Sequence, residues 1–353
     1  MQNITLDIIK SIDSQNMYQL LKDYWIHIEN AINAAQKSKA VFDAPATDIV
    51  ILGIGGSAIS GELLRSYIKK LNFKKEVRIR IIRGNEIPDN INMNTCVFVS
   101  SYSGNTEETL SALEIVKKKT KNLIAITSGG KLEEMFVSQK LPILKLPGGM
   151  MPRCSLAYSF FHLIYVLVRQ NIIEDSFIYG AVQELLARKN NEDFDFSHID
   201  NNNIAIDIAK KFTNKIPIIY SSELMQAVNL RWRAQIQENA NSISFGNIFP
   251  EANHNEINGW NYPKDLLDRF YFLFLLEKED NLTAQRSMEL ARTILEEENI
   301  ATMELEGNGK HFLTRMFDLI CISDWTSFYL AIIYDVDPTT IPTITKLKAL
   351  ASR

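Results

Sequence analysis

Two short segments of the sequence combine glycines with hydroxyl side chains, each directly after an apolar run. The first is Gly53-Ile54-Gly55-Gly56-Ser57-Ala58, and the second is Ser101-Tyr102-Ser103-Gly104-Asn105-Thr106. Glycines at the start of a helix leave backbone N–H groups open to an anion, and hydroxyl groups add neutral hydrogen-bond donors. Two such turns at the ends of separate strands predict a binding site for a phosphate monoester. Its expected members are Ser57, Ser101, Ser103 and Thr106, with the backbone of Gly55 and Gly56.

Each segment also has a simpler explanation. A tight strand-to-helix turn can need glycine without any ligand, and Ser103 or Asn105 could simply cap the next helix. The first segment also fits a dinucleotide-binding turn, because Ala58 stands where that fingerprint allows alanine and Arg83 ends the second predicted strand, where a 2′-phosphate could bind. An oxidoreductase of this kind would leave 101–109 unexplained. A nucleoside triphosphate loop is excluded, because no G-x-x-x-x-G-K-[ST] sequence occurs.

The elements around these segments alternate between strand and helix. Apolar runs predict strands over 48–54, 77–82, 95–100, 123–127, 141–146, 216–220, 242–246, 270–276 and 300–305. Helices are predicted over 60–70, 106–118, 131–138, 156–169, 284–298, 313–336 and 339–353. Alternation at this spacing is typical of βαβ units with a mostly parallel sheet, so the fold class is α/β.

The chain therefore divides into two α/β halves. We expect a helical leader over 1–45, a first domain over 46–188 with the phosphate-binding segments, a polar linker over 189–203 and a second domain over 204–353. Each domain is predicted to be an αβα sandwich around a flavodoxin-like parallel sheet. An apolar stripe that includes Trp25 and Ile32 leads us to expect the leader to pack on the first domain, and the chain is expected to end in a short amphipathic helix.

Composition narrows the class of protein. The chain has 353 residues, with 38 Lys and Arg against 42 Asp and Glu, so its formal net charge is −4 and it lacks the basic surplus of a nucleic-acid binder. Cys96, Cys154 and Cys321 are too few and too far apart for a disulfide framework or a CxxC metal site. We read no signal peptide and no run of 18 apolar residues. We therefore expect a cytoplasmic protein that does not enter a membrane.

The motifs taken together resemble a known family. GIGGSAISG at 53–61 and SSYSGNTEET at 100–109 look like a sugar isomerase (SIS) domain, which binds phosphosugars. Further segments are similar to the bifunctional phosphoglucose/phosphomannose isomerase family: Met151-Pro152-Arg153, Arg231-Trp232-Arg233, Gln237-Glu238-Asn239-Ala240, Pro250-Glu251-Ala252-Asn253-His254-Asn255-Glu256, Gly259-Trp260, Asp337-Pro338-Thr339-Thr340 and Ile344-Thr345-Lys346-Leu347-Lys348. The resemblance covers about residues 45–350. One departure is Asn241, where the family often carries lysine, a difference that could tune substrate preference.

This resemblance implies an aldose–ketose isomerase that interconverts glucose 6-phosphate and mannose 6-phosphate with fructose 6-phosphate. It implies that Glu238 is the base that moves a proton between C2 and C1, that His254 and Lys348 open the sugar ring, and that Arg153 stabilises the enediolate. Proton transfer through a cis-enediol requires no metal or other cofactor. The resemblance also implies a homodimer in which His254 reaches the site of the neighbouring subunit. Lys346 competes with Lys348, because the two face directions about 200° apart on a helix.

Two alternatives stay open at this point. A non-catalytic phosphosugar-binding protein would keep the serine segments and lose the base, whereas this chain keeps Glu238, His254 and Lys348. Another SIS-type isomerase would act on a different sugar phosphate.

Overall fold

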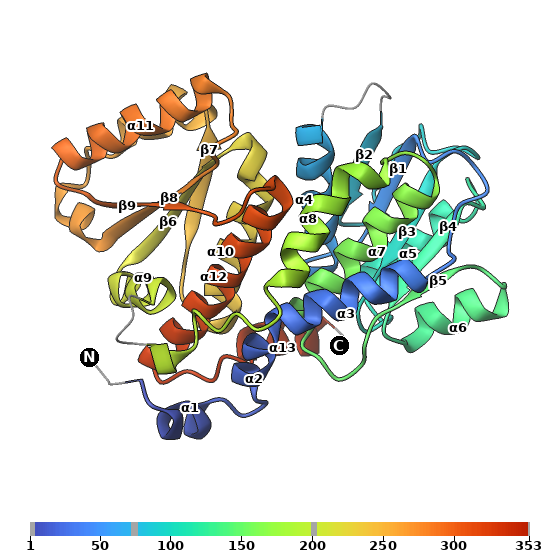
Figure 1. The fold of residues 1–353 in the computed structure, drawn as a ribbon, viewed down its shortest axis with the longest axis horizontal. Coiled ribbons are helices and arrows are strands. Elements are labelled where there is room, and N and C mark those ends of the chain that lie inside the picture. The colour runs from blue at the N-terminus through green and yellow to red at the C-terminus, as the bar shows by residue number, and fades with distance from the viewer. Residues whose placement is uncertain (1–3, 72–76, 199–202, 352–353) are drawn as a thin grey trace. The chain divides into compact units, whose positions relative to one another are not determined.

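The computed structural model describes residues 4–71, 77–198 and 203–351, and the chain forms two compact units (Figure 1). We call Trp25–Lys189 the N-terminal unit. The second, which we call the C-terminal unit, consists of Met1–Tyr24 together with Asn190–Arg353. In each unit helices cover both faces of a parallel sheet (Figure 1). The expected α/β class, with two parallel-sheet domains, is therefore confirmed.

The N-terminal unit is built around five parallel strands in the order β2-β1-β3-β4-β5. The strands are β1 (Asp48–Leu52), β2 (Arg78–Ile82), β3 (Cys96–Ser100), β4 (Leu123–Thr127) and β5 (Ile143–Lys145). The helices are α3 (Tyr24–Lys37), α4 (Gly56–Leu71), α5 (Glu107–Val116), α6 (Gly130–Ser138), α7 (Leu156–Arg169) and α8 (Asp175–Ala187). Every β1 residue after Asp48 is buried, as are all five residues of β3 and of β4, which is why these runs are apolar throughout.

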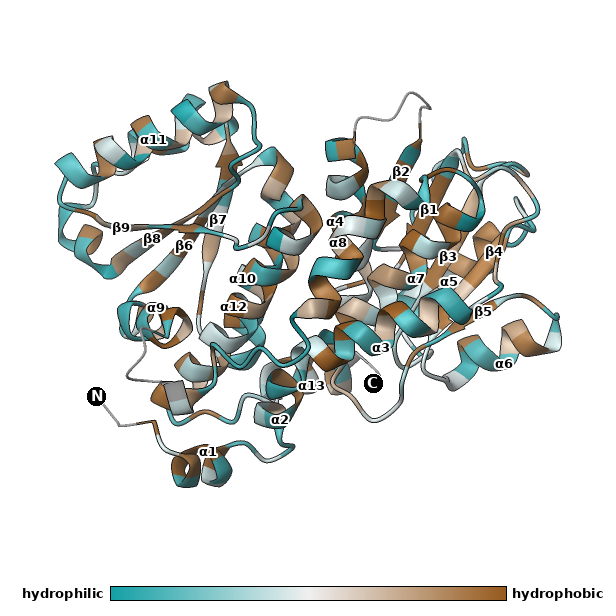
Figure 2. Cartoon of the chain, viewed as in Figure 1, coloured by the Kyte–Doolittle hydropathy of each residue, from teal (hydrophilic) through white to brown (hydrophobic). Residues whose placement is uncertain are grey.

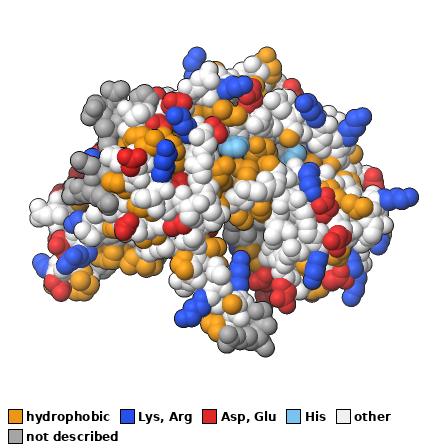
Figure 3. Space-filling model, turned by 90° about the horizontal axis from the view of Figure 1, so that it is seen from below, with side chains coloured by type: hydrophobic (Ala, Val, Ile, Leu, Met, Phe, Trp, Pro, Cys, Tyr) orange, Lys and Arg blue, Asp and Glu red, His pale blue; other side chains and the backbone are white. Residues whose placement is uncertain are grey.

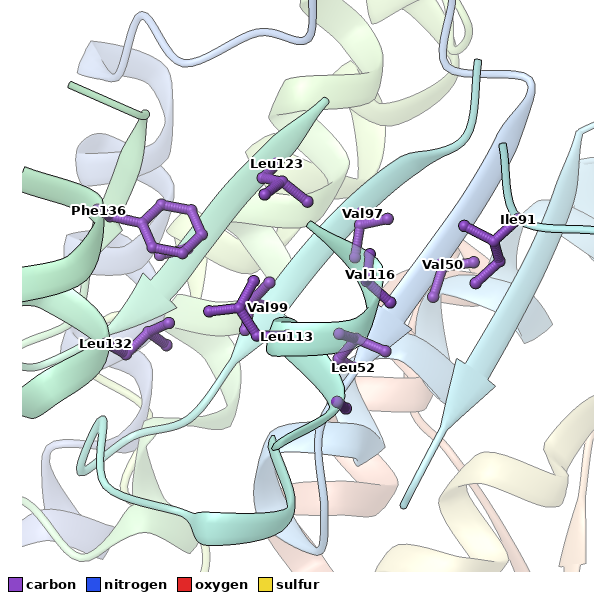
Figure 4. Packing of buried hydrophobic residues seen from close by; sticks show 12 residues of the cluster. Val50, Leu52, Ile91, Val97, Val99, Leu113, Val116, Leu123, Leu132 and Phe136 are labelled. Atoms are coloured by element: carbon purple, nitrogen blue, oxygen red, sulfur yellow. The ribbon is translucent and has the colours of Figure 1, made fainter. Parts of the chain in front are cut away.

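The core on one face of this sheet joins the strands to α5 and α6. Figure 4 shows side chains of β1 and β3, such as Leu52 and Val99, meeting Leu113 of α5, while Leu132 and Phe136 come from α6. The strands of this sheet are largely apolar and several of the covering helices mix polar and apolar residues (Figure 2). On the opposite face α4 packs against α7. The covering helices therefore leave the ends of the strands as the places where loops can gather functional groups.

The C-terminal unit repeats this plan with four parallel strands in the order β7-β6-β8-β9. The strands are β6 (Ile216–Ser222), β7 (Phe245–Phe249), β8 (Phe270–Leu276) and β9 (Ala301–Glu306). The helices are α1 (Leu6–Ile12), α2 (Met17–Lys22), α9 (Ile204–Phe212), α10 (Gln226–Asn239), α11 (Leu282–Glu297), α12 (Phe312–Ile333) and α13 (Pro342–Ala351). Helices α9, α10 and α12 pack together, and α11 covers the other face of the sheet (Figure 1).

Helix α12 is long and apolar enough to cross a membrane by length and composition alone, and it is the one such helix among the described residues. Its most apolar window is 94% buried inside the structure. It also carries buried charged side chains, Arg315, Asp318 and Asp324. These features identify α12 as the central core helix of the C-terminal unit.

The sequence located all nine strands that the structure describes, with the largest shift at β7, which begins at Phe245 instead of 242. Three helices were not predicted: α8, α9 and α10. The linker expected over 189–203 includes a short 3-10 helix, Phe196–His198, and the buried side chain of Asp195, while 199–202 lie outside the described residues.

The leader was expected to pack on the first domain, which is right for α3 with Trp25 and Ile32 and wrong for the part before Trp25. It is three helices rather than one, because Asp13 ends α1 and accepts hydrogen bonds from the backbone N–H groups of Met17 and Tyr18, which start α2. Helices α1 and α2 belong to the C-terminal unit, not to the first domain. Hydrogen bonds fix them there, from Tyr18 Oη to Asp195 at 2.5 Å and from Ser14 Oγ to Asp337 at 2.5 Å.

Candidate functional site

Both glycine- and serine-containing segments lie at one place in the N-terminal unit. They follow β1 and β3, which are neighbours in the sheet, and the chain continues to β2 on one side and to β4 on the other. The carboxyl ends of such strands form a crevice where open α/β sheets bind their ligands. The topology therefore places the segments that carry Ser57, Ser101, Ser103 and Thr106 after the carboxyl ends of two adjacent strands.

The first segment turns sharply from β1 into α4. Gly55 has φ +55°, a conformation that favours glycine, and α4 begins at Gly56. A Cβ atom on Gly53 would lie 3.1 Å from the carbonyl oxygen of Ser100, so this turn runs close to the end of β3. Ser57 is half-buried in the first turn of α4, and its backbone N–H donates to Ile54 O at 3.1 Å.

The second segment is held closed by a pair of hydroxyl groups. Ser101 Oγ and Thr106 Oγ1 are 2.8 Å apart, although the two residues lie at opposite ends of the turn. Ser103 is exposed and its Oγ accepts a hydrogen bond from the backbone N–H of Asn105. A Cβ atom on Gly104 would lie 1.8 Å from the carbonyl oxygen of Gly129, so only glycine fits there.

Helix α5 begins directly after this turn with its first N–H groups uncapped. Thr106 is the N-cap residue, but its side chain makes no capping hydrogen bond and bonds Ser101 instead. Uncapped N–H groups and the helix dipole favour an anion at this position. Glu107 and Glu108 lie in the same turn and are exposed to solvent. Neither Ser103 nor Asn105 is therefore the N-cap of α5, and Asn105 Oδ1 instead accepts from the backbone N–H of Lys131 at 3.1 Å, in the first turn of α6.

Arg153 lies beside the first segment and is buried, with 4% of its surface exposed. A Cβ atom on Gly56 would lie 3.7 Å from the backbone nitrogen of Arg153. The turn that precedes Arg153 is attached to the second segment through Tyr102, whose hydroxyl donates to Pro147 O at 2.8 Å and accepts from Met150 N at 2.8 Å. Burial raises the pKa of Tyr102. The buried Arg153 thus lies next to the first of the two glycine- and serine-containing turns.

Tyr102 is a residue that the sequence did not reveal as part of this arrangement. The sequence pattern assigns it no role, and nothing in that pattern shows that the Tyr102 hydroxyl bonds the backbone of Pro147 and Met150. By contrast, Arg83, which supported the dinucleotide alternative, is paired with Glu62 at 2.5 Å. A guanidinium already occupied by a carboxylate is a poor receptor for a 2′-phosphate.

In the C-terminal unit, Glu238 lies in the last turn of α10 and is half-buried. The helix ends there because Asn241 adopts φ +49°, a conformation that asparagine tolerates better than most residues. Gln237 Nε2 donates to Ser244 O at 2.8 Å and attaches the end of the helix to the chain just before β7. The departure from the family pattern at Asn241 therefore coincides with the helix stop.

His254 lies in the segment that follows β7. It ends a short 3-10 helix, Glu251–His254, and its side chain is exposed. Two residues later, Glu256 accepts a hydrogen bond from Tyr220 Oη of β6 at 2.6 Å. This contact attaches the segment to the face of the sheet that α11 covers, where the side chain of Tyr220 is buried.

Glu238 and His254 are carried on opposite faces of the C-terminal sheet. Gly246 of β7 faces α10, because a Cβ atom there would lie 3.1 Å from Arg233 Cδ of that helix. Its neighbour Asn247 therefore points to the other face, where its side chain bonds Glu256 at 2.5 Å. Within one chain the sheet separates the two predicted catalytic groups.

The remaining predicted residue, Lys348, lies on α13 and is exposed, as is its competitor Lys346. Ile344, Leu347 and Leu350 of the same helix are also exposed. The C-terminal unit by itself gives neither lysine a buried position, so the choice between them stays open.

The described residues form no metal centre, and those on the face drawn in Figure 3 form no surface of a single charge sign. Among the described residues, no group of three or more His, Cys, Asp and Glu side chains is placed to hold a metal ion. On the face shown in Figure 3, the described Lys and Arg side chains lie among Asp and Glu side chains. The site must therefore be read from hydroxyl groups, backbone amides and single charged residues.

Comparisons with known proteins agree with this geometry. A model of the SIS domain matches residues 44–133, and a model described as the bacterial phospho-glucose isomerase C-terminal SIS domain matches residues 201–350. The bifunctional phosphoglucose/phosphomannose isomerase of Caldicellulosiruptor bescii is 37% identical over 303 residues, which are 85% of this chain and 88% of that protein. The enzyme of the same name from Aquifex aeolicus is 31% identical, over 86% of this chain and 90% of that protein.

Two further similarities are informative. The D-glucosamine-6-phosphate 4-epimerase of Sulfolobus acidocaldarius is 32% identical over 69% of this chain and 71% of that protein. A crystal structure of a hypothetical protein from Thermus thermophilus superposes with a TM-score of 0.70, covering 98% of this chain and 92% of that one at 14% identity. The structural likeness supports the fold, and the sequence likeness supports a family.

Proposed function

The chain belongs to the bifunctional phosphoglucose/phosphomannose isomerase family, and from this premise we propose that it interconverts glucose 6-phosphate and mannose 6-phosphate with fructose 6-phosphate. It is an enzyme, an aldose–ketose isomerase of sugar phosphates. The observation that carries the proposal is the pair of turns after β1 and β3, with the open N-terminus of α5, a pair of hydroxyl groups in contact and a buried arginine beside the first turn.

The reaction sets four chemical requirements. The sugar ring must open, a proton must leave C2 and reach C1 or the reverse, the enediolate between these steps must be stabilised, and the phosphate must hold the carbon chain in register. Each requirement has a candidate group in this chain.

We assign the phosphate to Ser57, Ser101, Ser103 and Thr106, with the backbone N–H groups of Gly55 and Gly56. Hydroxyl and amide donors bind the dianion, and the binding energy of this non-reacting group can be used to orient C1 and C2. The 2.8 Å contact between Ser101 and Thr106 supports the assignment, because it holds two of the donors together before any ligand arrives.

Glu238 is the proposed base, and Arg153 the proposed partner of the enediolate oxygen. A carboxylate at C2 and C1 can accept the proton and return it to the neighbouring carbon. A guanidinium stays charged at every working pH, so it can balance the negative charge that develops on oxygen. The burial of Arg153 strengthens its electrostatic effect, because the surrounding dielectric is low.

His254 and Lys348 are proposed to exchange the protons of ring opening. An imidazole titrates near neutral pH and can serve as acid and base in turn. We further propose that the enzyme is a cytoplasmic homodimer and that His254 serves the site of the neighbouring subunit. The separation of Glu238 and His254 by the sheet of their own unit supports this sharing.

The test is turnover of fructose 6-phosphate in the presence of EDTA, with glucose 6-phosphate and mannose 6-phosphate resolved as separate products. We expect both products, and a loss of roughly 1,000-fold in kcat for Glu238→Gln, the scale of a removed general base. A cis-enediol route moves only a proton, so EDTA should not slow it. If glucose 6-phosphate were the only product, the enzyme would act on glucose 6-phosphate and not on mannose 6-phosphate. If the protein bound phosphosugar and formed neither product, a non-catalytic sensor would be favoured.

One relative points to a second candidate reaction. The epimerase from Sulfolobus acidocaldarius shares 32% identity, so an amino sugar phosphate must be tested beside fructose 6-phosphate. Conversion of glucosamine 6-phosphate to its 4-epimer, with fructose 6-phosphate left unchanged, would replace the proposed activity. Binding of NADP would instead revive the dinucleotide alternative.

A further inference from the structure

The segment that carries His254 has little backbone structure of its own. Between β7 and Trp260 it consists of two four-residue 3-10 helices, Glu251–His254 and Glu256–Gly259. Backbone hydrogen bonds within it close single turns, such as that from Asn253 N to Pro250 O at 3.0 Å. A segment of this kind depends on side chains for a defined position.

Four side chains supply that position. Glu256 Oε1 accepts from Tyr220 Oη at 2.6 Å, and Glu256 Oε2 accepts from Asn247 Nδ2 at 2.5 Å. Trp260 Nε1 donates to Tyr220 Oη at 2.9 Å. Asn247 lies in β7, just before the segment, Trp260 lies at its end, and Glu256 lies inside it. The network therefore holds the segment at both ends and in the middle.

The directions of these bonds require a carboxylate at position 256. Asn247 Oδ1 accepts from the backbone N–H of Ile248 at 2.8 Å, so its amide must present N–H to Glu256. The oxygen of Tyr220 already accepts from Trp260, so its proton goes to Glu256 as well. Both partners therefore donate, and an amide in place of the carboxylate would set one donor against another.

The surroundings hold the network rigidly. Tyr220 is fully buried, its ring packs edge-on against Phe249 and Phe272, and Trp260 packs edge-on against Phe272. Burial raises the pKa of Tyr220, and the hydrogen bond to Glu256 raises it further, so the phenol stays a proton donor. His254, two residues from Glu256, is exposed on the segment that this network anchors.

We propose that Glu256 is a positioning residue for His254, with Tyr220 and Asn247 as its fixed donors. This inference rests on the proposed function, in which His254 takes part in ring opening. Glu256 does not touch the reacting atoms. It fixes where His254 is presented, so its loss should impair ring opening and leave the later proton transfer at carbon intact.

The experiment measures the activity of the Glu256→Gln variant on two substrates. Fructose 6-phosphate closes its ring through the C5 hydroxyl, whereas 5-deoxyfructose 6-phosphate lacks that hydroxyl and stays open. We expect kcat on fructose 6-phosphate to fall by roughly 30- to 100-fold, since displacing a catalytic group by about 1 Å can cost about 100-fold. The ratio of the two activities should shift toward the open substrate, as it should in His254→Ala.

A double-mutant cycle separates positioning from general damage. If Glu256 acts through His254, adding Glu256→Gln to His254→Ala should cost less than about 3-fold more, whereas independent effects would multiply. Tyr220→Phe is a second variant, expected to shift the substrate ratio in the same direction. Tyr329→Phe is the matched control, because it removes another buried hydroxyl of the same unit, one bonded to Phe194 O, and should leave the ratio unchanged.

The outcomes separate the two proposals. If wild type is active and Glu256→Gln is fully active as well, the positioning role of Glu256 is wrong and the proposed isomerase function still holds. Equal losses on both substrates, or losses that multiply with His254→Ala, would also overturn it and indicate a structural role. A wild type that does not isomerise fructose 6-phosphate would overturn the proposed function and this inference with it.

Discussion

The turn from Ser101 to Thr106, which we propose binds phosphate, can form only because Gly104 has no side chain. The φ of Gly104 is +69°, and a Cβ atom would lie 1.8 Å from the backbone oxygen of Gly129. Gly104→Ala should therefore force the turn away from α6 and lower the unfolding free energy by at least about 2 kcal/mol, from strain and overlap together. We also expect the KM for fructose 6-phosphate to rise, because Ser101 and Thr106 would no longer be held together.

Gly84→Ala is the control for this prediction. Gly84 has no neighbouring atom within 4 Å of a Cβ position and is not among the residues with positive φ. Urea unfolding and steady-state kinetics of both variants give the comparison. A Gly104→Ala protein as stable as Gly84→Ala, with an unchanged KM, would contradict the assigned role of the turn.

His162 makes stability depend on pH. It lies in α7, is 3% exposed, and its Nε2 lies 3.2 Å from Lys145 O. Burial lowers its pKa from 6.5 to about 4, so the folded protein holds it neutral. As pH falls below 6.5 the unfolded chain gains a proton that the folded chain does not, and folding is disfavoured until the folded pKa is reached. The loss between pH 7 and pH 5 should be about 2 kcal/mol.

The measurement is urea unfolding of wild type and His162→Gln at the two pH values. Glutamine can still donate to Lys145 O and cannot titrate, so the variant should lose about 2 kcal/mol less than wild type over this range. His311→Gln removes an exposed histidine and should match wild type. Equal pH dependence in wild type and His162→Gln would show that His162 is not the group responsible.

At the scale of elements, α10 and α12 are joined by a buried ion pair. Arg231 Nη2 lies 3.0 and 2.9 Å from the two carboxylate oxygens of Asp324, and both side chains are at most 5% exposed. Arg231→Met would leave a buried carboxylate without this partner and should cost about 3–5 kcal/mol. Replacing both, as Arg231→Met/Asp324→Leu, should restore much of the loss, because no unpaired charge remains.

Urea unfolding of the single and double variants tests this coupling. The control is Arg286→Ala, which breaks an ion pair with Glu289 whose members are 64% and 56% exposed and which should change stability by less than about 0.5 kcal/mol. A double variant as unstable as Arg231→Met would mean that packing, and not the unpaired carboxylate, dominates this contact.

Helix α10 shows why some elements could be predicted from the sequence and others could not. The strands were found because burial on both faces makes them continuously apolar, as in β3 and β4. Helix α10 was missed because polar side chains are buried along it, among them Asn229, Arg231 and Gln235, so no apolar stripe marks its inner face. Its sequence was noticed for its motifs instead.

The candidate site, like the fold, could be predicted from the sequence only in part. Local pattern was enough for Ser101 to Thr106, because a strand, a glycine and hydroxyl groups stand next to each other in the chain. It was not enough for Tyr102 or for the Tyr220–Glu256 contact, because those bonds join residues 48 and 36 positions apart and no local pattern encodes them. The part of the leader before Trp25 was misplaced for a similar reason, since Ser14 bonds Asp337 far along the chain.

At the scale of the whole molecule, the two units share one plan and differ in chemistry. Both sheets begin with the strand order second, first, third, fourth, and the N-terminal sheet adds a fifth strand. Only the N-terminal unit has glycine-rich turns after its first and third strands, while β6 is followed by Glu223 and β8 by Glu277. The proposed phosphate site thus lies in one unit, and the proposed acid–base residues lie in the other.

The proposed sharing of His254 makes a prediction about mixed dimers. Glu238→Gln and His254→Ala should each be nearly inactive alone. In a mixed dimer of the two, one site would combine both substitutions and the other would have an intact Glu238 and an intact His254. With random pairing half of the dimers are mixed, so an equimolar mixture should regain about a quarter of wild-type activity, as expected for a two-fold symmetric dimer with shared sites.

The converse mixture decides between shared and separate sites. When wild type pairs with the double variant Glu238→Gln/His254→Ala, each shared site would receive one altered residue, so the mixed dimer should be nearly inactive. Were both residues to act within one chain, the wild-type subunit would keep its site and the mixed dimer would retain half its activity. Differently tagged subunits allow the mixed dimers to be purified and assayed directly. Inactive dimers from the first mixture and half-active dimers from the second would place Glu238 and His254 in one subunit's site, despite the sheet that separates them.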